Sequence, residues 1–281
     1  MLVKPNKPTT TTSDDPQSAT WTNEECDTLQ AEQNAAVQTV WSGLHPAIAL
    51  VCLCGNHDVE NCPTPTSIQT FTKAFRDDYL AFWANGTYNI VVNSALFSDP
   101  SSTLDLYTAQ LTWLEDRLRY ASTAGDPHHN NNNKARHIFV FSHHPWLLYS
   151  KNKSAEDLTG LTPLPSWGGS AGGGGAAAAV VQYIPDSYFH IPLQYRKQAM
   201  DLFQRYGVSA AFSGHFHQNV VSKSSFGMEM IVTGSLSVVL DSTGNPNNRQ
   251  EPNKQGICIV QVEHDPSGGP GKFHHRLVGL T

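Results

Sequence analysis

The chain has 281 residues, of which 39% are hydrophobic and 10% aromatic, so it can build a core of its own without disulfide support. Its formal net charge of −6, without a cluster of Lys and Arg, excludes a protein that tracks the nucleic-acid backbone. No apolar stretch approaches the roughly 20 residues of a membrane-spanning helix. Residues 1–20 also lack the charged start and apolar centre of a signal peptide.

The cysteines indicate the compartment. There are 5, at irregular spacing: Cys26, Cys52, Cys54, Cys62 and Cys258. An odd number without a regular framework suits a reduced, cytoplasmic protein better than a secreted one. We therefore expect a soluble cytoplasmic protein, monomeric, with no nucleic-acid or membrane partner.

Low-complexity stretches divide the chain. Residues 1–22 form a polar arm rich in Pro, Thr and Ser, and we predict one domain over residues 23–281. Two stretches, one rich in Asn and one in Gly and Ala, predict flexible insertions near 126–134 and 151–182. Neither composition buries enough apolar surface to offset the entropy lost on ordering.

Helix-like and strand-like segments alternate up to residue 213, and strand-like segments follow alone. The predicted helices are Asn23 to Ser42, Thr66 to Phe82, Leu106 to Tyr120 and Leu193 to Tyr206. The first four predicted strands are Ala47 to Cys54, Tyr88 to Ser94, His137 to Ser142 and Val208 to Ser213. The later ones are Val220 to Ser222, Met228 to Thr233, Ser237 to Leu240, Gly256 to Val262 and His274 to Val278. This order predicts an α/β fold with a β-rich C-terminal part.

Three of the predicted strands are followed by histidine or amide side chains, which are residue types that can bind metal ions. The residues that follow them are Gly55, Asn56, His57 and Asp58; His143 and His144; and Gly214, His215 and His217. Because the carboxyl ends of strands in an open α/β sheet share one crevice, we expect these groups to meet there. In an extended segment, residues two apart point the same way, so His215 and His217 would face one site with Phe216 behind.

The types of these residues narrow the choice of metal ion. An Asn oxygen with neutral imidazoles suits a borderline divalent ion such as Mn, Fe or Zn, and suits Ca or Mg poorly. Each residue alone has a structural explanation, since a strand-end His is usually packed in the core and a Gly-Asn pair is usually a turn. The joint placement of the groups is what favours a site.

The motifs resemble those of the calcineurin-like metallophosphoesterase superfamily. The matching pieces are "GNHD" at residues 55–58, "FSHHPW" around His143, and "GHFH" at residues 214–217. The stretches "GNHDVENCPT", "VVNSALF" and "VSAAFSGHFHQN" are similar to the CPPED1-type branch, described as Ser/Thr protein phosphatases. The resemblance covers residues 45–260 apart from the insertions. It implies a four-layer sandwich of two mixed β-sheets flanked by helices, here without its first strands.

The resemblance also implies roles for single residues. Asn56, His143 and His215 would bind one metal ion, and His217 would bind the other. His57 would act as general acid or contact the phosphate, with Asp58 holding its ring. Two divalent ions, Mn, Fe or Zn, would activate a water molecule for attack on a phosphomonoester carried by a protein or a small molecule. No further cofactor is expected.

Two motifs of that family are not in this sequence. They are an Asp-x-His motif and a Gly-Asp motif, which precede "GNHD" in relatives and supply further metal ligands. We therefore expect the chain to be the truncated part of a longer phosphatase, with room for one ion. The alternatives are an inactive relative that serves as a metal-binding or interaction module, and a phosphodiesterase.

Overall fold

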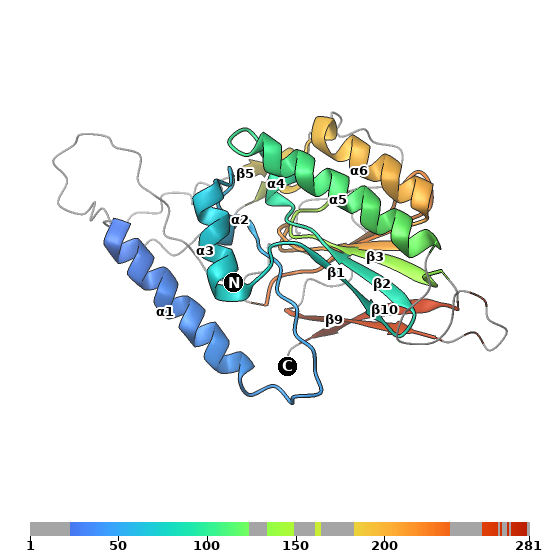
Figure 1. Ribbon diagram of the computed structural model, residues 1–281, viewed down its shortest axis with the longest axis horizontal. Coiled ribbons are helices and arrows are strands. Elements are labelled where there is room, and N and C mark those ends of the chain that lie inside the picture. The colour runs from blue at the N-terminus through green and yellow to red at the C-terminus, as the bar shows by residue number, and fades with distance from the viewer. Residues whose placement is uncertain are drawn as a thin grey trace, which may run out of the picture.

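A six-stranded mixed sheet is the centre of the computed structural model, which describes residues 23–123, 134–148, 161–163, 183–236, 255–263, 265, 269 and 271–279 (Figure 1). The strand order is β1-β2-β3-β6-β8-β7. The strands are β1 (Leu80–Ala84), β2 (Thr87–Val91), β3 (His137–Phe141), β6 (Ala210–Ser213), β7 (Val220–Lys223) and β8 (Glu229–Val232). Strands β2, β3, β6 and β8 are parallel to one another, so their carboxyl ends lie along one edge. The mixed α/β class predicted from the sequence is confirmed.

Helices cover one face of this sheet and a second, smaller sheet covers the other (Figure 1). The helices are α1 (Asn23–Trp41), α2 (Asn56–Val59), α3 (Pro65–Phe75), α4 (Ala95–Ser98), α5 (Leu104–Thr123) and α6 (Leu193–Tyr206). Strands β9 (Gly256–Val262) and β10 (Phe273–Gly279) pair antiparallel as the second sheet. Two short pieces, β4 (Leu161–Pro163) and β5 (Tyr183–Pro185), pair with each other, and a 3₁₀ turn, η2 (Asp186–Phe189), follows them.

The alternation of side chains along β3 separates two cores. Ile138 and Val140 point to the helices, where Leu114, Leu118 and Phe203 pack on them. Phe139 points the other way and packs with residues of β6, β9 and β10. Because neighbouring residues of a strand face opposite sides, one apolar strand can fill both cores. Helices, main sheet and small sheet thus form three successive layers of the predicted sandwich.

The C-terminal boundary predicted for the second helix is wrong. The sequence predicted helix from Thr66 to Phe82, but α3 ends at Phe75 and Leu80–Ala84 forms β1, which pairs antiparallel with β2. The turn between them is Asn85-Gly86, with φ of 48° and 79°. Two such residues with positive φ make the tight turn that suits a twisted hairpin. This pair of residues was therefore the signal that the helical pattern had ended.

The strand predicted from Ala47 to Cys54 is also wrong. Residues 49–55 have no regular secondary structure, and Ile48, Leu50 and Val51 are 56%, 48% and 38% exposed. An apolar run forms a strand only where another strand pairs with it, and none of the described residues does so here. The segment links α1 to α2. Helix α1 meets α3, because Gln38 Nε2 donates to the Ala74 carbonyl at 3.0 Å and the rings of Trp41 and Phe75 lie 5.8 Å apart.

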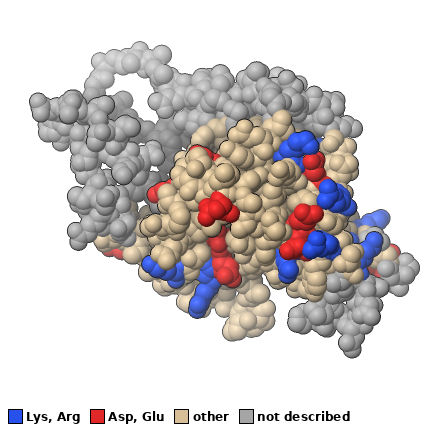
Figure 2. Space-filling model, turned by 45° about the horizontal axis from the view of Figure 1, so that its top comes forward, with Lys and Arg blue, Asp and Glu red and all other residues tan. Residues whose placement is uncertain are grey.

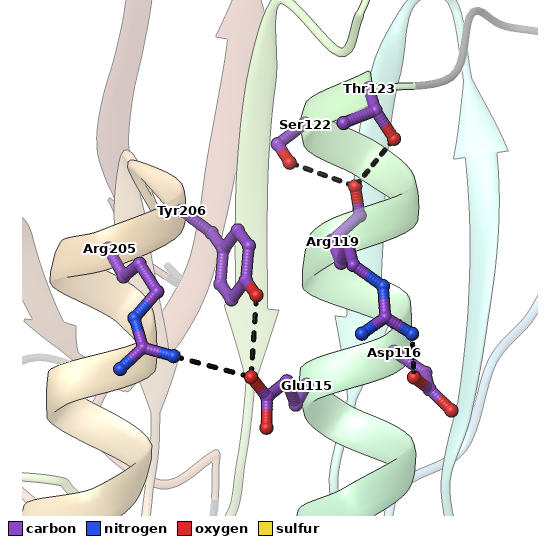
Figure 3. A network of polar contacts seen from close by, with 7 residues as sticks. All are labelled: Glu115, Asp116, Arg119, Ser122, Thr123, Arg205 and Tyr206. Carbon is purple, nitrogen blue, oxygen red and sulfur yellow. Dashed lines mark hydrogen bonds and ion pairs between the residues drawn. The ribbon is translucent and has the colours of Figure 1, made fainter.

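Polar contacts join α5 to α6 on the outer face of the helix layer (Figure 3). Arg205 Nη1 and the Tyr206 hydroxyl donate to Glu115 Oε1 at 3.3 and 3.4 Å. The Arg205 and Glu115 side chains are 61% and 41% exposed, so this ion pair contributes little to stability. Farther along α5, Arg119 pairs with Asp116, and the Ser122 and Thr123 hydroxyls donate to the Arg119 carbonyl. The side of the molecule where α5 and α6 lie shows acidic and basic groups interspersed with uncharged surface (Figure 2).

Some predictions fall outside the described residues. The strand Ser237 to Leu240, the polar arm 1–22 and most of the two insertions are among them; only Leu161–Pro163 of the second insertion is described, as β4. The division into one domain with an arm stays a prediction. Within the described ranges, no helix is both long enough and apolar enough to cross a bilayer.

Candidate metal centre

The predicted site residues come together at the carboxyl edge of the main sheet. His143 follows β3 and His215 follows β6, and these two strands are parallel neighbours. Asn56 begins α2, which lies at the same edge although the segment before it is not a strand. His143 Nε2 lies 2.9 Å from Asn56 Oδ1 and 3.1 Å from His215 Nδ1. Three of the six predicted site residues thus point potential ligand atoms at one spot, and we call them the Asn56 trio.

Both imidazoles of the trio are held neutral. Burial, with the nearby His57, lowers the pKa of His143 to about 3. Burial and His143 lower the pKa of His215 well below its usual range. A neutral imidazole keeps a free lone pair, which is the form that binds a metal ion.

A glycine is required at the start of α2 because the backbone lies directly on the His143 ring. A Cβ added to Gly55 would meet His143 Nδ1 and Cε1 at 2.9 Å. Gly214, which precedes His215, has no such restriction, since the nearest atom to an added Cβ is the His143 carbonyl oxygen at 3.9 Å. Glycine therefore matters at position 55 for close approach.

The backbone strain lies on the histidines themselves. His215 and His217 have φ of 63° and 56°, the left-handed region that ordinary residues rarely adopt. Each such residue costs about 1–3 kcal/mol and persists only where the surroundings hold it. The extended geometry predicted for this segment is therefore wrong, although Phe216 between them is buried behind the site as expected, with Leu148 and Phe189.

A cavity of about 260 Å³ lies at this site, and two members of the trio, His143 and His215, line it. The other three predicted site residues, His57, Asp58 and His217, line it as well. The segment after β8 also lines it, with residues Thr233, Gly234, Ser235 and Leu236. This segment is tied to the histidine loop, because Gly234 N donates to Asn219 Oδ1 at 2.8 Å and Thr233 N to the Ser213 carbonyl at 2.8 Å. Burial, followed by His57, lowers the pKa of His217. His217 is thus at the cavity without being one of the three converging groups.

Asp58 acts on the loop that begins the site. Its Oδ2 accepts a hydrogen bond from Gly55 N at 2.8 Å, closing the first turn of α2. This contact fixes the position of Gly55 against His143. That Asp58 also orients the His57 ring stays a prediction.

A buried polar network behind His143 was missed from the sequence. Ser94 Oγ accepts hydrogen bonds from His143 N at 3.1 Å and His144 N at 2.9 Å, and lies 3.0 Å from His144 Nδ1. With both lone pairs in use, the hydroxyl proton is left for His144 Nδ1, which sets the tautomer of that ring. His144, 2% exposed, packs its ring on His215 at 4.4 Å. The pair His143-His144 was visible in the sequence, but the structure shows that His144 is held by Ser94 while His143 lines the cavity.

Gln110 on α5 fixes the segment that carries Ser94. Its Oε1 accepts from Asn93 N at 2.8 Å and its Nε2 donates to the Asn93 carbonyl at 2.9 Å, both fully buried. Asn93 Nδ2 in turn donates to Asp78 Oδ2 at 2.9 Å, and burial raises the pKa of Asp78.

We expect Gln110→Leu to lower the free energy of unfolding by about 3 kcal/mol, since it leaves a buried N–H and a buried carbonyl of Asn93 without partners. Urea unfolding at pH 7 measures the loss. The matched control Gln198→Leu, at an exposed position of α6, should change stability by less than about 0.5 kcal/mol. Equal effects of the two substitutions would contradict the role given to Gln110.

The trio fits a transition-metal ion by its donor types and spacing. Ligand atoms about 2.1 Å from a metal ion lie about 3 Å from one another, and His143 Nε2 lies 2.9 and 3.1 Å from the other two ligand atoms. Two imidazoles and an amide oxygen suit Mn, Fe or Zn. Among the described residues, no group of three or more His, Cys, Asp or Glu side chains is arranged to hold a metal ion. The candidate centre therefore depends on the amide of Asn56.

Comparison with known proteins gives relatives of one kind. The serine/threonine-protein phosphatase CPPED1 of Bos taurus is 31% identical over 249 residues, 89% of this chain and 61% of the relative. That of Danio rerio is 30% identical over 198 residues, 70% of this chain and 51% of the relative. A solved dimetal phosphatase from Danio rerio overlays with a TM-score of 0.38 at 12% identity, covering 75% of this chain and 66% of that one. No family model matches the chain.

The mixed α/β fold, with a histidine-rich crevice at the strand ends, agrees with the calcineurin-like metallophosphoesterases that the motifs resemble. More narrowly, the chain is related in sequence to the CPPED1 serine/threonine phosphatases. It spans about half to three fifths of the length of those two relatives, 51% and 61%.

Proposed function

We propose that the protein is a metal-dependent phosphoesterase that hydrolyses phosphomonoesters, with phosphoserine or phosphothreonine in a protein as its substrate class. The observation that carries this proposal is the position of His143 Nε2, which lies 2.9 Å from Asn56 Oδ1 and 3.1 Å from His215 Nδ1. The names of the CPPED1 relatives support the choice of phosphoserine and phosphothreonine.

Asn56, His143 and His215 would hold one divalent ion, Mn, Fe or Zn, and His217 would contribute to a second. Such an ion, when bound, neutralises charge on the phosphate oxygens and makes water a better nucleophile. The chain supplies the neutral imidazoles, the amide oxygen and a backbone that fixes them before the ion arrives.

His57 would be the group that works on the substrate. It lines the cavity with His143, His215 and His217, and it follows Asn56 directly at the start of α2. In this position it can contact a phosphate oxygen or give a proton to the leaving oxygen. Thr233 to Leu236 also line this cavity, and the part of the substrate beyond the phosphate would lie against them.

The test is hydrolysis of p-nitrophenyl phosphate by the chain after chelation and after addition of Mn²⁺. We expect activity only with Mn²⁺, and little activity on bis(p-nitrophenyl) phosphate, which reports a phosphodiesterase. In His57→Ala, kcat should fall by about 100-fold because proton transfer by a positioned side chain contributes about 10²–10⁴ to the rate.

His45→Ala, which removes an exposed imidazole, serves as the control and should be as active as the unmodified chain. Mn²⁺ binding without hydrolysis would favour the alternative of a metal-binding module. Preference for the diester would instead make the protein a phosphodiesterase. If kcat stayed the same in His57→Ala, the role given to His57 would be wrong.

We also propose a cytoplasmic location, with phosphorylated proteins as partners. Cys52, Cys54, Cys62 and Cys258 are free thiols, as expected in a reducing compartment. Fractionation of cells that express the tagged protein tests the location.

A further inference from the structure

Two residues outside the predicted site lie directly behind the Asn56 trio. Asn61 follows α2, and its Oδ1 accepts a hydrogen bond from Asn56 Nδ2 at 2.9 Å. Tyr188 lies in η2, 127 residues farther along the chain, and its hydroxyl donates to the same Asn61 Oδ1 at 3.5 Å. The Tyr188 ring also lies 5.4 Å from the His215 ring. Asn61 and Tyr188 therefore connect two members of the trio from the outside.

Asn61 decides which atom Asn56 presents to the site. An amide has an oxygen that accepts and a nitrogen that only donates, and rotation by 180° exchanges them. With Nδ2 bound to Asn61, the oxygen of Asn56 faces His143. The opposite rotamer would place N–H groups at the position of a cation, where they cannot act as ligands.

The backbone between the two asparagines is strained in a way that places Asn61. Glu60 has φ of 74° and ψ of 160°, a region that is almost restricted to glycine and costs about 1–3 kcal/mol. This residue turns the chain back at the end of α2, so that Asn61 meets Asn56 five residues before it. Strain of this kind persists where the surrounding structure enforces it.

Tyr188 restricts His215 from the other side. Its ring and that of Phe189 lie 5.4 and 5.6 Å from the His215 ring. The residue thus limits the orientation of the His215 ring while Nδ1 faces His143.

We propose that Asn61 and Tyr188 are positioning residues that hold Asn56 and His215 in the orientations needed to bind a divalent ion. This inference rests on the proposed metal centre. Such outer residues fix the orientation of ligands, and their loss typically lowers metal affinity by about 10–100-fold.

The experiment is titration of the chelator-treated protein with Co²⁺, followed by calorimetry and by visible absorption, which reports the geometry around the ion. We expect Asn61→Leu to lower Co²⁺ affinity by about 10–100-fold and to change the spectrum. Asn61→Asp keeps the acceptor for Asn56 Nδ2, so it should restore both. Tyr188→Leu should lower affinity by about 10-fold.

The matched control is Gln69→Leu, which replaces an exposed amide on neighbouring α3. It should bind Co²⁺ like the unmodified chain. Because Asn61→Leu leaves Nδ2 of the buried Asn56 without a partner, the metal-free variant should unfold at a somewhat lower temperature. Co²⁺ is therefore titrated at a temperature where thermal unfolding shows every metal-free variant to be folded, which separates positioning from folding. Unchanged affinity and spectrum in Asn61→Leu would overturn this inference alone, whereas an unmodified chain that binds no Co²⁺ would overturn the proposed centre and the inference with it.

Discussion

Replacement of His143 by alanine is expected to lower affinity for Mn²⁺ by at least about 100-fold, more than loss of an outer residue, and Mn²⁺-dependent hydrolysis on the order of 1000-fold. His143 is the middle member of the trio, because its Nε2 lies within 3.1 Å of both other ligand atoms. Its loss removes one ligand and the contact that aligns the other two. Calorimetric titration with Mn²⁺ and p-nitrophenyl phosphate hydrolysis measure the two effects.

The control for this variant is His274→Ala, which removes an exposed imidazole on β10 and should change neither quantity. If His143→Ala bound Mn²⁺ as tightly as the unmodified chain, the trio would not be the metal centre. A gain in affinity on adding imidazole, which can occupy the vacated space, would further support the assignment.

The free energy of unfolding is expected to fall as the pH is lowered from 7.5 to 4.5. His190 is 3% exposed, and burial, followed by Arg196, lowers its pKa to about 4. The unfolded chain, with a histidine pKa of about 6.5, therefore takes up a proton first as the pH falls. The neutral, buried form of His190 contributes fully to the free energy of unfolding above about pH 6.5. This contribution is lost between about pH 6.5 and 4, at about 1.4 kcal/mol per pH unit for each such histidine. For His190 the total is about 3 kcal/mol.

Burial lowers the pKa of His143, His144 and His215 in the same direction, so the slopes add. Urea unfolding of the chelator-treated protein between pH 7.5 and 4.5 measures the sum. In His190→Leu the slope below pH 6.5 should decrease by about 1.4 kcal/mol per pH unit. Ile191→Val, a buried neighbour that does not titrate, should lower stability equally at every pH. Stability that stays constant down to pH 4.5 would contradict neutral burial of these histidines.

The convergence of His143 and His215 was predictable from the sequence because parallel strands carry it. β3 and β6 are neighbours with residues Phe139 and Ala210 in register, so their following loops meet whatever the sequence separation. Asn56 reaches the same edge by a different route, since the predicted strand before it is an extended segment with exposed side chains. The position was predicted correctly, and the local structure that produces it was not.

The groups that orient the site were not predictable because they depend on tertiary contacts. Gln110 is one apolar-flanked residue of an amphipathic helix, and nothing local marks it as the partner of Asn93. Tyr188 meets Asn61 across 127 residues. Sequence patterns report periodicity and local turns, whereas such pairs are set by how the layers pack.

Strain could be placed only by the structure. Glycine is the residue that most readily adopts a positive φ, yet near the site the positive φ angles fall on His215, His217 and Glu60, and not on Gly55 or Gly214. Side chains that need a particular direction can occupy such positions when burial and hydrogen bonds hold them, as with His215. All three residues adjoin the proposed centre.

The central claim is that Asn56, His143 and His215 together hold one divalent ion. The most direct measurement is anomalous X-ray scattering from crystals of the chain grown with Mn²⁺. We expect a peak within about 2.3 Å of Asn56 Oδ1, His143 Nε2 and His215 Nδ1. A well-ordered trio with no peak there at saturating Mn²⁺, or with the ion bound elsewhere, would contradict it.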